Sequence, residues 1–279
     1  MATQAAADVV SAASVTAAAA PAATDATASA SATALPHAGF ALAIDRIDYA
    51  IMVPLVYLSL LALLVGIIWR IMVIARSPAP PYALRLYPAR RRPGLAALGD
   101  VFAMPQVRKH NPLFWVFLMI YHAGFLLLIL GHLDIFPRID LVPAASRHML
   151  GAGAIGVAVT LPVLYFIFRR FRSPHREIST PADYLLLLLL LFLFLFGDLM
   201  SWGNSWSASG FVMTKQDFAK YFEGLVRFSF ADPRAVLPGS HYHFAVIHVL
   251  LAEIFFILLP FTKIIHTFFS VPINLLRRK

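Results

Sequence analysis

The chain has 279 residues, of which 60% are hydrophobic and 13% charged, and its mean hydropathy is +0.76. This balance excludes an ordinary soluble domain and predicts an integral membrane protein. The formal net charge is +9, but its distribution along the chain argues against a nucleic-acid partner. The absence of cysteine excludes disulfides, a covalent CxxCH haem and a cysteine-ligated iron–sulfur cluster within this chain.

The amino-terminal region, residues 1–44, is rich in alanine, serine and threonine. Its composition predicts a low-complexity disordered tail. It lacks the basic stretch and compact apolar core of a secretory signal peptide. We expect the remaining residues, 45–279, to form one membrane domain.

Five segments are long and apolar enough to cross a bilayer, which needs about 20 residues per helix. They are roughly Tyr49–Trp69, Leu113–Leu133, Met149–Phe168, Tyr184–Met200 and Phe244–Thr267. The predicted fold class is therefore an all-α integral membrane protein with five transmembrane helices. The fourth segment is almost purely leucine and phenylalanine, and we expect it to face lipid.

The lysine and arginine residues predict the orientation of these helices. Fifteen of the 23 fall in the segment between the first two spans, in the turn after the third, and at the carboxyl terminus. Seven lie on the opposite side, together with seven of the 14 acidic residues, and Lys263 lies in the fifth span near its inner end. The positive-inside rule then places the amino terminus outside and the carboxyl terminus in the cytoplasm.

Two pairs of histidines are the most informative residues in the spans. His122 and His132 are ten residues apart in the second span, and His248 and His266 are eighteen apart in the fifth. Ionisable residues inside a bilayer are costly and mark functional sites. The predicted orientation places His132 and His248 near the outer side and His122 and His266 near the inner side.

The matched levels suggest two bis-histidine haems stacked across the bilayer, both non-covalent and therefore of b type. Zinc fits less well, because two imidazoles per level lack the further ligands of a closed zinc site. Continuous helices would separate the histidines by about 15 Å in the second span and about 27 Å in the fifth, a mismatch that the sequence does not resolve. Gly124 and Gly131 would let a flat macrocycle approach the backbone, or they serve ordinary helix packing.

The residues around these histidines resemble the gamma-subunit superfamily of respiratory nitrate reductases, which are dihaem cytochrome b membrane subunits. They are also similar to the related membrane cytochromes of complexes linked to dissimilatory sulfite reductase. The resemblance covers about residues 111–279. It is carried by YHAGFLLLILGH, RHMLGAGAIGV, FRSPHREISTPADYLLL and IHVLLAEIFFILLPFTKIIHTFFSVPINLLRRK.

The resemblance implies five spans with the amino terminus outside. It also implies an outer haem held by His132 and His248, and an inner haem held by His122 and His266. Quinol binds near the outer haem in this superfamily. The long segment between the first two spans, and PAASRHML where the nitrate branch has a lysine, favour the sulfur-linked branch without deciding between the two.

The expected function is electron transfer between a menaquinone or ubiquinone pool at the outer side and a cytoplasmic iron–sulfur subunit of an oxidoreductase complex. The chain is then a subunit of a respiratory complex in a bacterial or archaeal cytoplasmic (inner) membrane rather than a stand-alone enzyme. The direction of electron flow stays open. We expect the quinone contacts at Gly131, His132, Arg147 and His148.

Two other function classes stay open at this point. One is a redox-inert membrane anchor, and the other is a transporter that uses the histidines as a proton path. Two further features have alternative interpretations. The segment Asp217–Arg227 either roofs the outer site on the membrane surface or is a packed loop helix, and Glu253 is either a proton relay or a hydrogen-bonding group.

Overall fold

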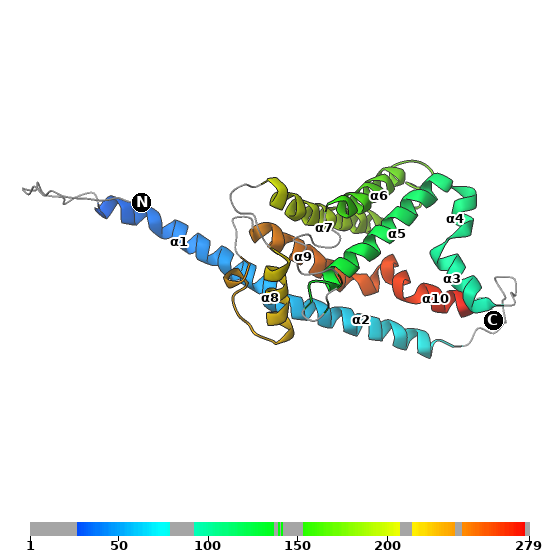
Figure 1. Ribbon diagram of the computed structural model, residues 1–279, viewed down its shortest axis with the longest axis horizontal. Helices are drawn as coiled ribbons and strands as arrows, with labels where there is room; N and C mark the ends of the chain where they lie inside the picture. Colours follow the sequence, from blue (N-terminus) through cyan, green and yellow to red (C-terminus); the bar gives the residue numbers. More distant parts are fainter. Residues whose placement is uncertain are drawn as a thin grey trace, which may run out of the picture. The chain divides into compact units, whose positions relative to one another are not determined.

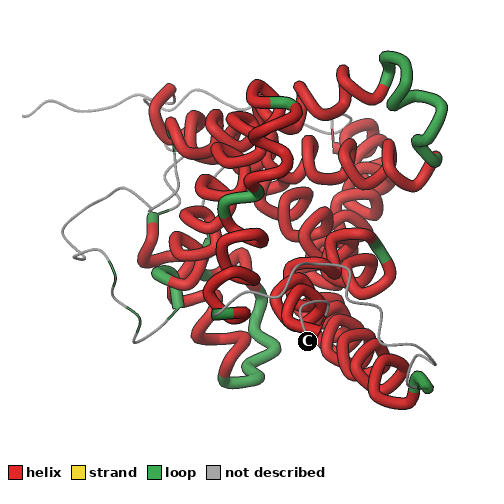
Figure 2. The backbone as a smooth tube through the Cα atoms, turned by 90° about the vertical axis from the view of Figure 1, so that its right-hand side faces the viewer, coloured by secondary structure: helices red, strands yellow, loops and turns green. Residues whose placement is uncertain are grey.

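The computed structural model describes residues 27–78, 92–136, 139, 141, 153–206, 214–237 and 242–276. Figure 2 shows that these residues form helices and connecting loops, with no strand among them. The chain divides into two units, residues 1–45 and residues 46–279. The all-helical part of the predicted fold class is thereby confirmed.

The elements follow the apolar segments of the sequence. In chain order they are α1 (Thr27–Ala50), the π-helix η1 (Ile51–Leu55), α2 (Val56–Arg76), α3 (Pro93–Phe102), α4 (Pro105–His110), α5 (Pro112–Leu133), α6 (Ala154–Arg170), α7 (Pro181–Trp206), α8 (Lys215–Val226), the 3₁₀-helix η2 (Pro233–Ala235), α9 (Tyr242–Leu258), the 3₁₀-helices η3 (Leu259–Phe261) and η4 (Lys263–Ile265), and α10 (His266–Leu276).

Helix α1 begins inside the amino-terminal region that the sequence analysis expected to be disordered up to residue 44. Residues 27–44 are helical, whereas residues 1–26 lie outside the described part of the chain. The segment is rich in alanine, which has the highest intrinsic helix propensity of all residues. Low complexity and helix formation are therefore compatible here.

Four helices are long and apolar enough to cross a membrane: Gly39–Arg76, Pro112–Leu133, Pro181–Trp202 and Tyr242–Phe261. They correspond to the first, second, fourth and fifth predicted spans. The third predicted span coincides largely with α6, which has 17 residues and is shorter than the other four. Residues 142–152, just before this helix, lie outside the described part.

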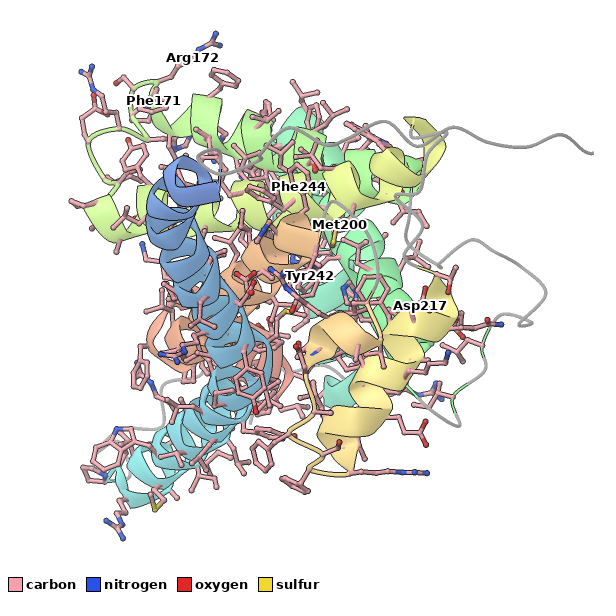
Figure 3. The ribbon with its side chains drawn as sticks, turned by 90° about the vertical axis from the view of Figure 1, so that its left-hand side faces the viewer. Phe171, Arg172, Met200, Asp217, Tyr242 and Phe244 are labelled. Carbon is pink, nitrogen blue, oxygen red and sulfur yellow. The ribbon has the colours of Figure 1, made fainter. Side chains whose placement is uncertain are left out.

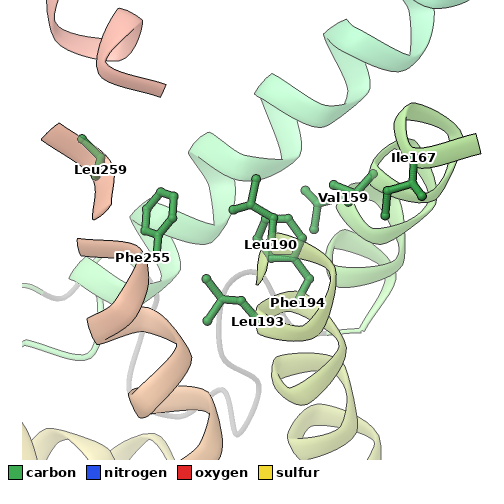
Figure 4. Close-up of a cluster of buried hydrophobic side chains, with 8 residues drawn as sticks. Val159, Ile167, Leu190, Leu193, Phe194, Phe255 and Leu259 are labelled. Carbon is green, nitrogen blue, oxygen red and sulfur yellow. The ribbon is translucent and has the colours of Figure 1, made fainter. Parts of the chain in front are cut away.

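The helices of residues 46–279 pack in a row in which α5 contacts α6, α6 contacts α7, α7 contacts α9, and α9 contacts α2 (Figure 1). Helix α7 therefore has neighbours on both sides. Its Leu190, Leu193 and Phe194 are buried in a cluster that also contains Val159 of α6 and Phe255 of α9 (Figure 4). The expectation that the leucine-rich helix faces lipid is wrong for this face, because two helices cover it.

A second apolar cluster lies where η1, α8 and the start of α9 meet. It contains Met52, Tyr221, Tyr242 and Val246, and Figure 3 shows Tyr242 close to Met200 at the end of α7. The Tyr221 hydroxyl donates a hydrogen bond of 2.5 Å to the Met52 carbonyl. Burial raises the pKa of the Tyr221 phenol, which keeps it a neutral donor. Helix α8 is thus a packed helix, the second of the two interpretations of this segment.

The fifth predicted span is not one continuous helix. Helix α9 ends at Leu258, and η3 and η4 separate it from α10, which begins at His266. Pro260 lies in the break, where it can donate no backbone hydrogen bond. The five regular turns between His248 and His266, from which a separation of about 27 Å was expected, are therefore not made.

Candidate functional site

The first histidine pair joins α5 to α9 near the end of α5. The ring centres of His132 and His248 are 6.1 Å apart, and the two ring planes differ by only 16°. His248 is half-buried, and the His132 ring is exposed. The two imidazoles thus face each other nearly in parallel.

The second pair joins α5 to the beginning of α10. The ring centres of His122 and His266 are 6.3 Å apart, with an angle of 65° between the ring planes. The edge of the His122 ring also meets Tyr121, whose ring centre is 5.3 Å away. The structure therefore brings together the same two pairs that the sequence analysis expected.

The helix break explains how these pairs form despite the unequal spacings. Ten residues of α5 rise about 15 Å, and the regular part of α9 from His248 to Leu258 has the same rise. The next residues form η3 and η4 instead of further helical turns. The chain thus leaves the line of a continuous helix between Leu258 and His266, and His266 meets His122 beyond this break.

All four histidines present the same nitrogen to a backbone carbonyl. The Nδ1 atoms lie within hydrogen-bonding distance of the following carbonyl oxygens: Leu118 for His122 at 2.7 Å, Leu128 for His132 at 2.7 Å, Leu193 for His248 at 3.0 Å and Lys263 for His266 at 2.9 Å. A carbonyl oxygen only accepts, so each Nδ1 must carry the proton. In the neutral imidazole this leaves Nε2 with a free lone pair, which is the form that binds metals.

The distances within both pairs fit a metal ion held between two imidazoles. A metal about 2 Å from each ligating nitrogen would separate two opposed ring centres by about 6 Å. Helices α5 and α9 pack mainly against other helices and only slightly against each other. The residues present therefore fit a flat metal macrocycle at two levels, which His132 and His248 would hold at one level and His122 and His266 at the other.

A closed metal site built by the protein alone is not found in the described residues. No group of three or more His, Cys, Asp or Glu side chains among them could hold a metal ion. Two other described histidines make different contacts. His110 Nδ1 lies 2.9 Å from the Gln106 carbonyl, and His243 Nδ1 lies 3.1 Å from Asp48, so neither faces a second histidine.

The two glycines next to the α5 histidines are both buried, but the structure assigns Gly124 to helix packing. A Cβ atom at Gly124 would lie 2.7 Å from Val159 Cγ1 on α6. Of the two interpretations of this residue, ordinary close packing is therefore the one the structure supports. Gly131 is buried beside His132.

The expected quinone contacts are only partly covered by the structure. Gly131 and His132 lie at the end of α5, whereas Arg147 and His148 lie outside the described residues. Two residues after His132, Asp134 forms an ion pair of 2.8 Å with Lys215 at the start of α8. This ion pair holds α8 beside the end of α5 that carries His132.

Gly197 of α7 is a site residue that the histidine motifs did not indicate. A Cβ atom at Gly197 would lie only 3.2 Å from His248 Cε1, and the His248 ring bonds to the Leu193 carbonyl one turn earlier on the same helix. The lack of a side chain lets the imidazole approach the α7 backbone. In the sequence, the one feature that could have indicated this role is that Gly197 follows directly on a run of leucine and phenylalanine.

Comparison with known families supports the assignment made from the histidine motifs. A family model described as the nitrate reductase gamma subunit matches residues 105–279. The matched region begins at α4 and includes all four histidines. No curated protein matches the chain.

Proposed function

Because the chain belongs to the nitrate reductase gamma subunit family, which implies a membrane electron-transfer subunit of a respiratory complex, we propose that it carries two b haems between a quinone site and a cytoplasmic partner. The observation that carries the proposal is the meeting of four histidines in two pairs, with ring centres 6.1 and 6.3 Å apart. The Nδ1 atom of each ring also donates a hydrogen bond to a backbone carbonyl.

His132 and His248 would hold one haem, and His122 and His266 the other. When bound, the two haems supply one-electron transfer along the bundle. The protein fixes the ligands through the carbonyls of Leu118, Leu128, Leu193 and Lys263, which set the imidazole tautomers. Of these residues, Leu193 belongs to the packed core of α6, α7 and α9, and Leu128 packs against that core.

We place the amino terminus outside and count α6 as a membrane span, which brings the number of spans to five. The supporting argument is the excess of lysine and arginine on the side that carries the first loop and the carboxyl terminus. The His132–His248 pair is then the outer pair and the His122–His266 pair the inner one. The protein is a multi-pass component of a bacterial or archaeal cytoplasmic membrane.

At the outer pair, a quinol is oxidised and releases two protons outside. We assign the contacts to Gly131, His132, Arg147 and His148. Moving one electron inward against the membrane potential requires about 2.3 kcal/mol per 100 mV. Quinol oxidation outside, with electron delivery inside, therefore conserves energy, and quinone reduction would use the same parts in reverse.

The electrons leave to a cytoplasmic iron–sulfur subunit, since this chain has no cysteine to bind a cluster. The long first loop supplies a docking surface for it. In this loop, α3 packs against α10 and α4 against α5, and Trp115 Nε1 donates to the Ala103 carbonyl at 2.8 Å. This extended loop favours the sulfur-linked branch of the family over the nitrate branch as the source of the partner.

Absorption spectroscopy on the purified chain tests the haem assignment. The reduced minus oxidised spectrum with a pyridine haemochrome assay should give two b haems per chain. His266→Ala and His132→Ala should each lose about one haem. His110→Ala and His243→Ala, which alter histidines without a histidine partner, should keep both.

The alternatives predict other outcomes in the same experiment. A folded, fully assembled chain without a Soret band would contradict the proposal and favour a redox-inert anchor. A proton-path transporter would also lack the band. The helix break after Leu258 gives the transporter no support, because it lies at the end of the span Tyr242–Phe261 and not in its middle.

Reduction of the haems by a quinol tests the outer site. A menaquinol or ubiquinol analogue added to membranes should reduce the haems, and Arg147→Ala should slow this reaction. Arg227→Ala is the matched control, because Arg227 pairs with the exposed Glu223 at the end of α8. Equal rates in the wild type and both variants would remove Arg147 from the proposed site.

A further inference from the structure

The inner ligand His266 differs from the other three histidines in the way its position is determined. His122 and His132 bond to carbonyls four residues earlier in the regular helix α5, and His248 bonds to α7. His266 instead follows the break between α9 and α10. Its Nδ1 donates to the carbonyl of Lys263, the first residue of η4.

Helix α2 holds the break from one side. A Cβ atom at Gly66 would lie 2.6 Å from both Cβ and Cγ of Pro260, so only glycine lets the two segments approach this closely. One turn later, Arg70 Nε donates to the Pro260 carbonyl at 2.9 Å. Gly66 and Arg70 thus fix the start of the break through packing and a charge-assisted hydrogen bond.

Helix α7 holds the break from the other side. Lys263 Nζ lies 2.7 Å from Oδ1 and 2.9 Å from Oδ2 of Asp183, near the start of α7. The Asp183 side chain is only 5% exposed. It also accepts hydrogen bonds from the Thr180 amide and hydroxyl and lies 3.4 Å from Arg170. Asp183 is therefore a fixed anchor for the more exposed Lys263 chain.

Lys263 connects this anchor to the haem ligand. Its side chain is held by Asp183, and its backbone carbonyl fixes the His266 ring. A turn without regular helical hydrogen bonds needs such external contacts to keep one conformation. We infer that Gly66, Arg70 and Asp183 form a clamp on the helix break and are positioning residues for His266.

This inference rests on the proposed haem function and adds the residues that determine the geometry of one haem. The clamp acts only at the inner level. The outer level takes its carbonyls from α5 and α7, which contain no break at Leu128 or Leu193. Disturbing the clamp should therefore change one haem and leave the other unchanged.

The test uses the full chain purified with haem and compares Asp183→Asn, Lys263→Gln and Arg70→Gln with the wild type. The readouts are haem content, the midpoint potential of each haem, and the low-spin electron paramagnetic resonance signals. Loss of a contact that orients a metal-bound histidine weakens metal binding by about 10- to 100-fold. Each variant should either lose the inner haem or shift the midpoint potential and the signal of the inner haem. The outer haem should be unchanged.

Conservative and remote changes serve as controls. Lys263→Arg retains a cation facing Asp183 and should restore the wild-type signal of the inner haem. Glu223→Gln removes a carboxylate from an exposed ion pair, and Arg76→Gln removes an exposed arginine from the end of α2. Both should leave the two haems unchanged.

The possible outcomes separate this inference from the proposed function. A wild-type chain with two haems, and three variants with unchanged inner potential and signal, would overturn the clamp while the proposed function survives. A wild-type chain without haem would overturn both. If Asp183→Asn fails to fold, Arg70→Gln tests the clamp from its other side, and an unchanged inner haem in that variant overturns it.

Discussion

Gly197 and His248 meet at the contact between α7 and α9, where a Cβ atom on the glycine would lie 3.2 Å from the imidazole. This close approach lets His248 Nδ1 reach the Leu193 carbonyl on the same helix at 3.0 Å. The outer ligand thus depends on a residue that has no side chain. It also depends on a helix that carries none of the four histidines.

Enlarging Gly197 should therefore displace His248. Overpacking a buried contact costs about 1–3 kcal/mol, whereas replacing a mid-helix glycine by alanine gains about 1 kcal/mol of helix propensity. Gly197→Ala should thus be nearly neutral for the free energy of unfolding, and Gly197→Leu should lose the outer haem. Gly224→Leu is the control, because a Cβ atom there meets nothing within 4 Å. Two haems in Gly197→Leu would contradict this account.

Thr160 should stabilise the contact between α6 and α7. Its hydroxyl donates to Asp198 at 2.9 Å, Asp198 is 4% exposed, and a Cβ atom on Gly156 would overlap Asp198 Oδ1. Removing one partner of a buried hydrogen bond costs about 1–3 kcal/mol. Thr160→Val should lower the free energy of unfolding in detergent by this amount, and Thr160→Ser should not. Equal losses in both variants would assign the effect to packing instead.

Removing one member of the buried ion pair between Lys215 and Asp134 should destabilise the protein more than neutralising both members. The side chains are 14% and 1% exposed. Removing one partner of a buried pair costs about 3–5 kcal/mol, so Lys215→Met should destabilise the protein strongly. Lys215→Met combined with Asp134→Asn should regain most of the loss, since the amide still accepts from the Leu141 amide. A double variant as unstable as Lys215→Met would rule out charge as the cause.

Glu253 should lower the stability of the fold. It is 2% exposed in α9, and neither carboxyl oxygen has a hydrogen-bond partner among the described residues.

Replacing this carboxyl group should raise the unfolding temperature. An unsatisfied buried polar group costs about 1–3 kcal/mol, so Glu253→Leu should stabilise the protein by roughly this amount. Glu223→Gln, which changes an exposed carboxylate, should alter the stability by less than about 0.5 kcal/mol. A lower unfolding temperature for Glu253→Leu would show that the carboxyl group has a stabilising partner outside the described residues.

The sequence predicted the helical class, four of the spans and the pairing of the histidines, because apolar length and residue spacing are local properties. It did not predict that α9 would break before His266. Pro260 alone allows either a kink or a stop, and the choice depends on Gly66 and Arg70 of a distant helix. The packed face of α7 was missed for a similar reason, since a run of leucines packs equally well against lipid and against protein.

The glycine motifs show the same limit. Gly124 and Gly197 are both glycines close to a haem-ligand candidate. Of the two, Gly197 contacts an imidazole and Gly124 does not. Gly124 serves the contact with Val159. Which partner a glycine admits depends on the neighbouring helix, and this information is not contained in local spacing.

Electron paramagnetic resonance of the oxidised chain tests the paired ligation most directly. The ring planes of His132 and His248 differ by 16° and those of His122 and His266 by 65°, so the two haem irons should give two distinct low-spin signals. Alanine variants of His132 and His248 should abolish the same signal, and those of His122 and His266 the other. Loss of the same signal in His132→Ala and His122→Ala, or a single signal in the wild type, would contradict the account.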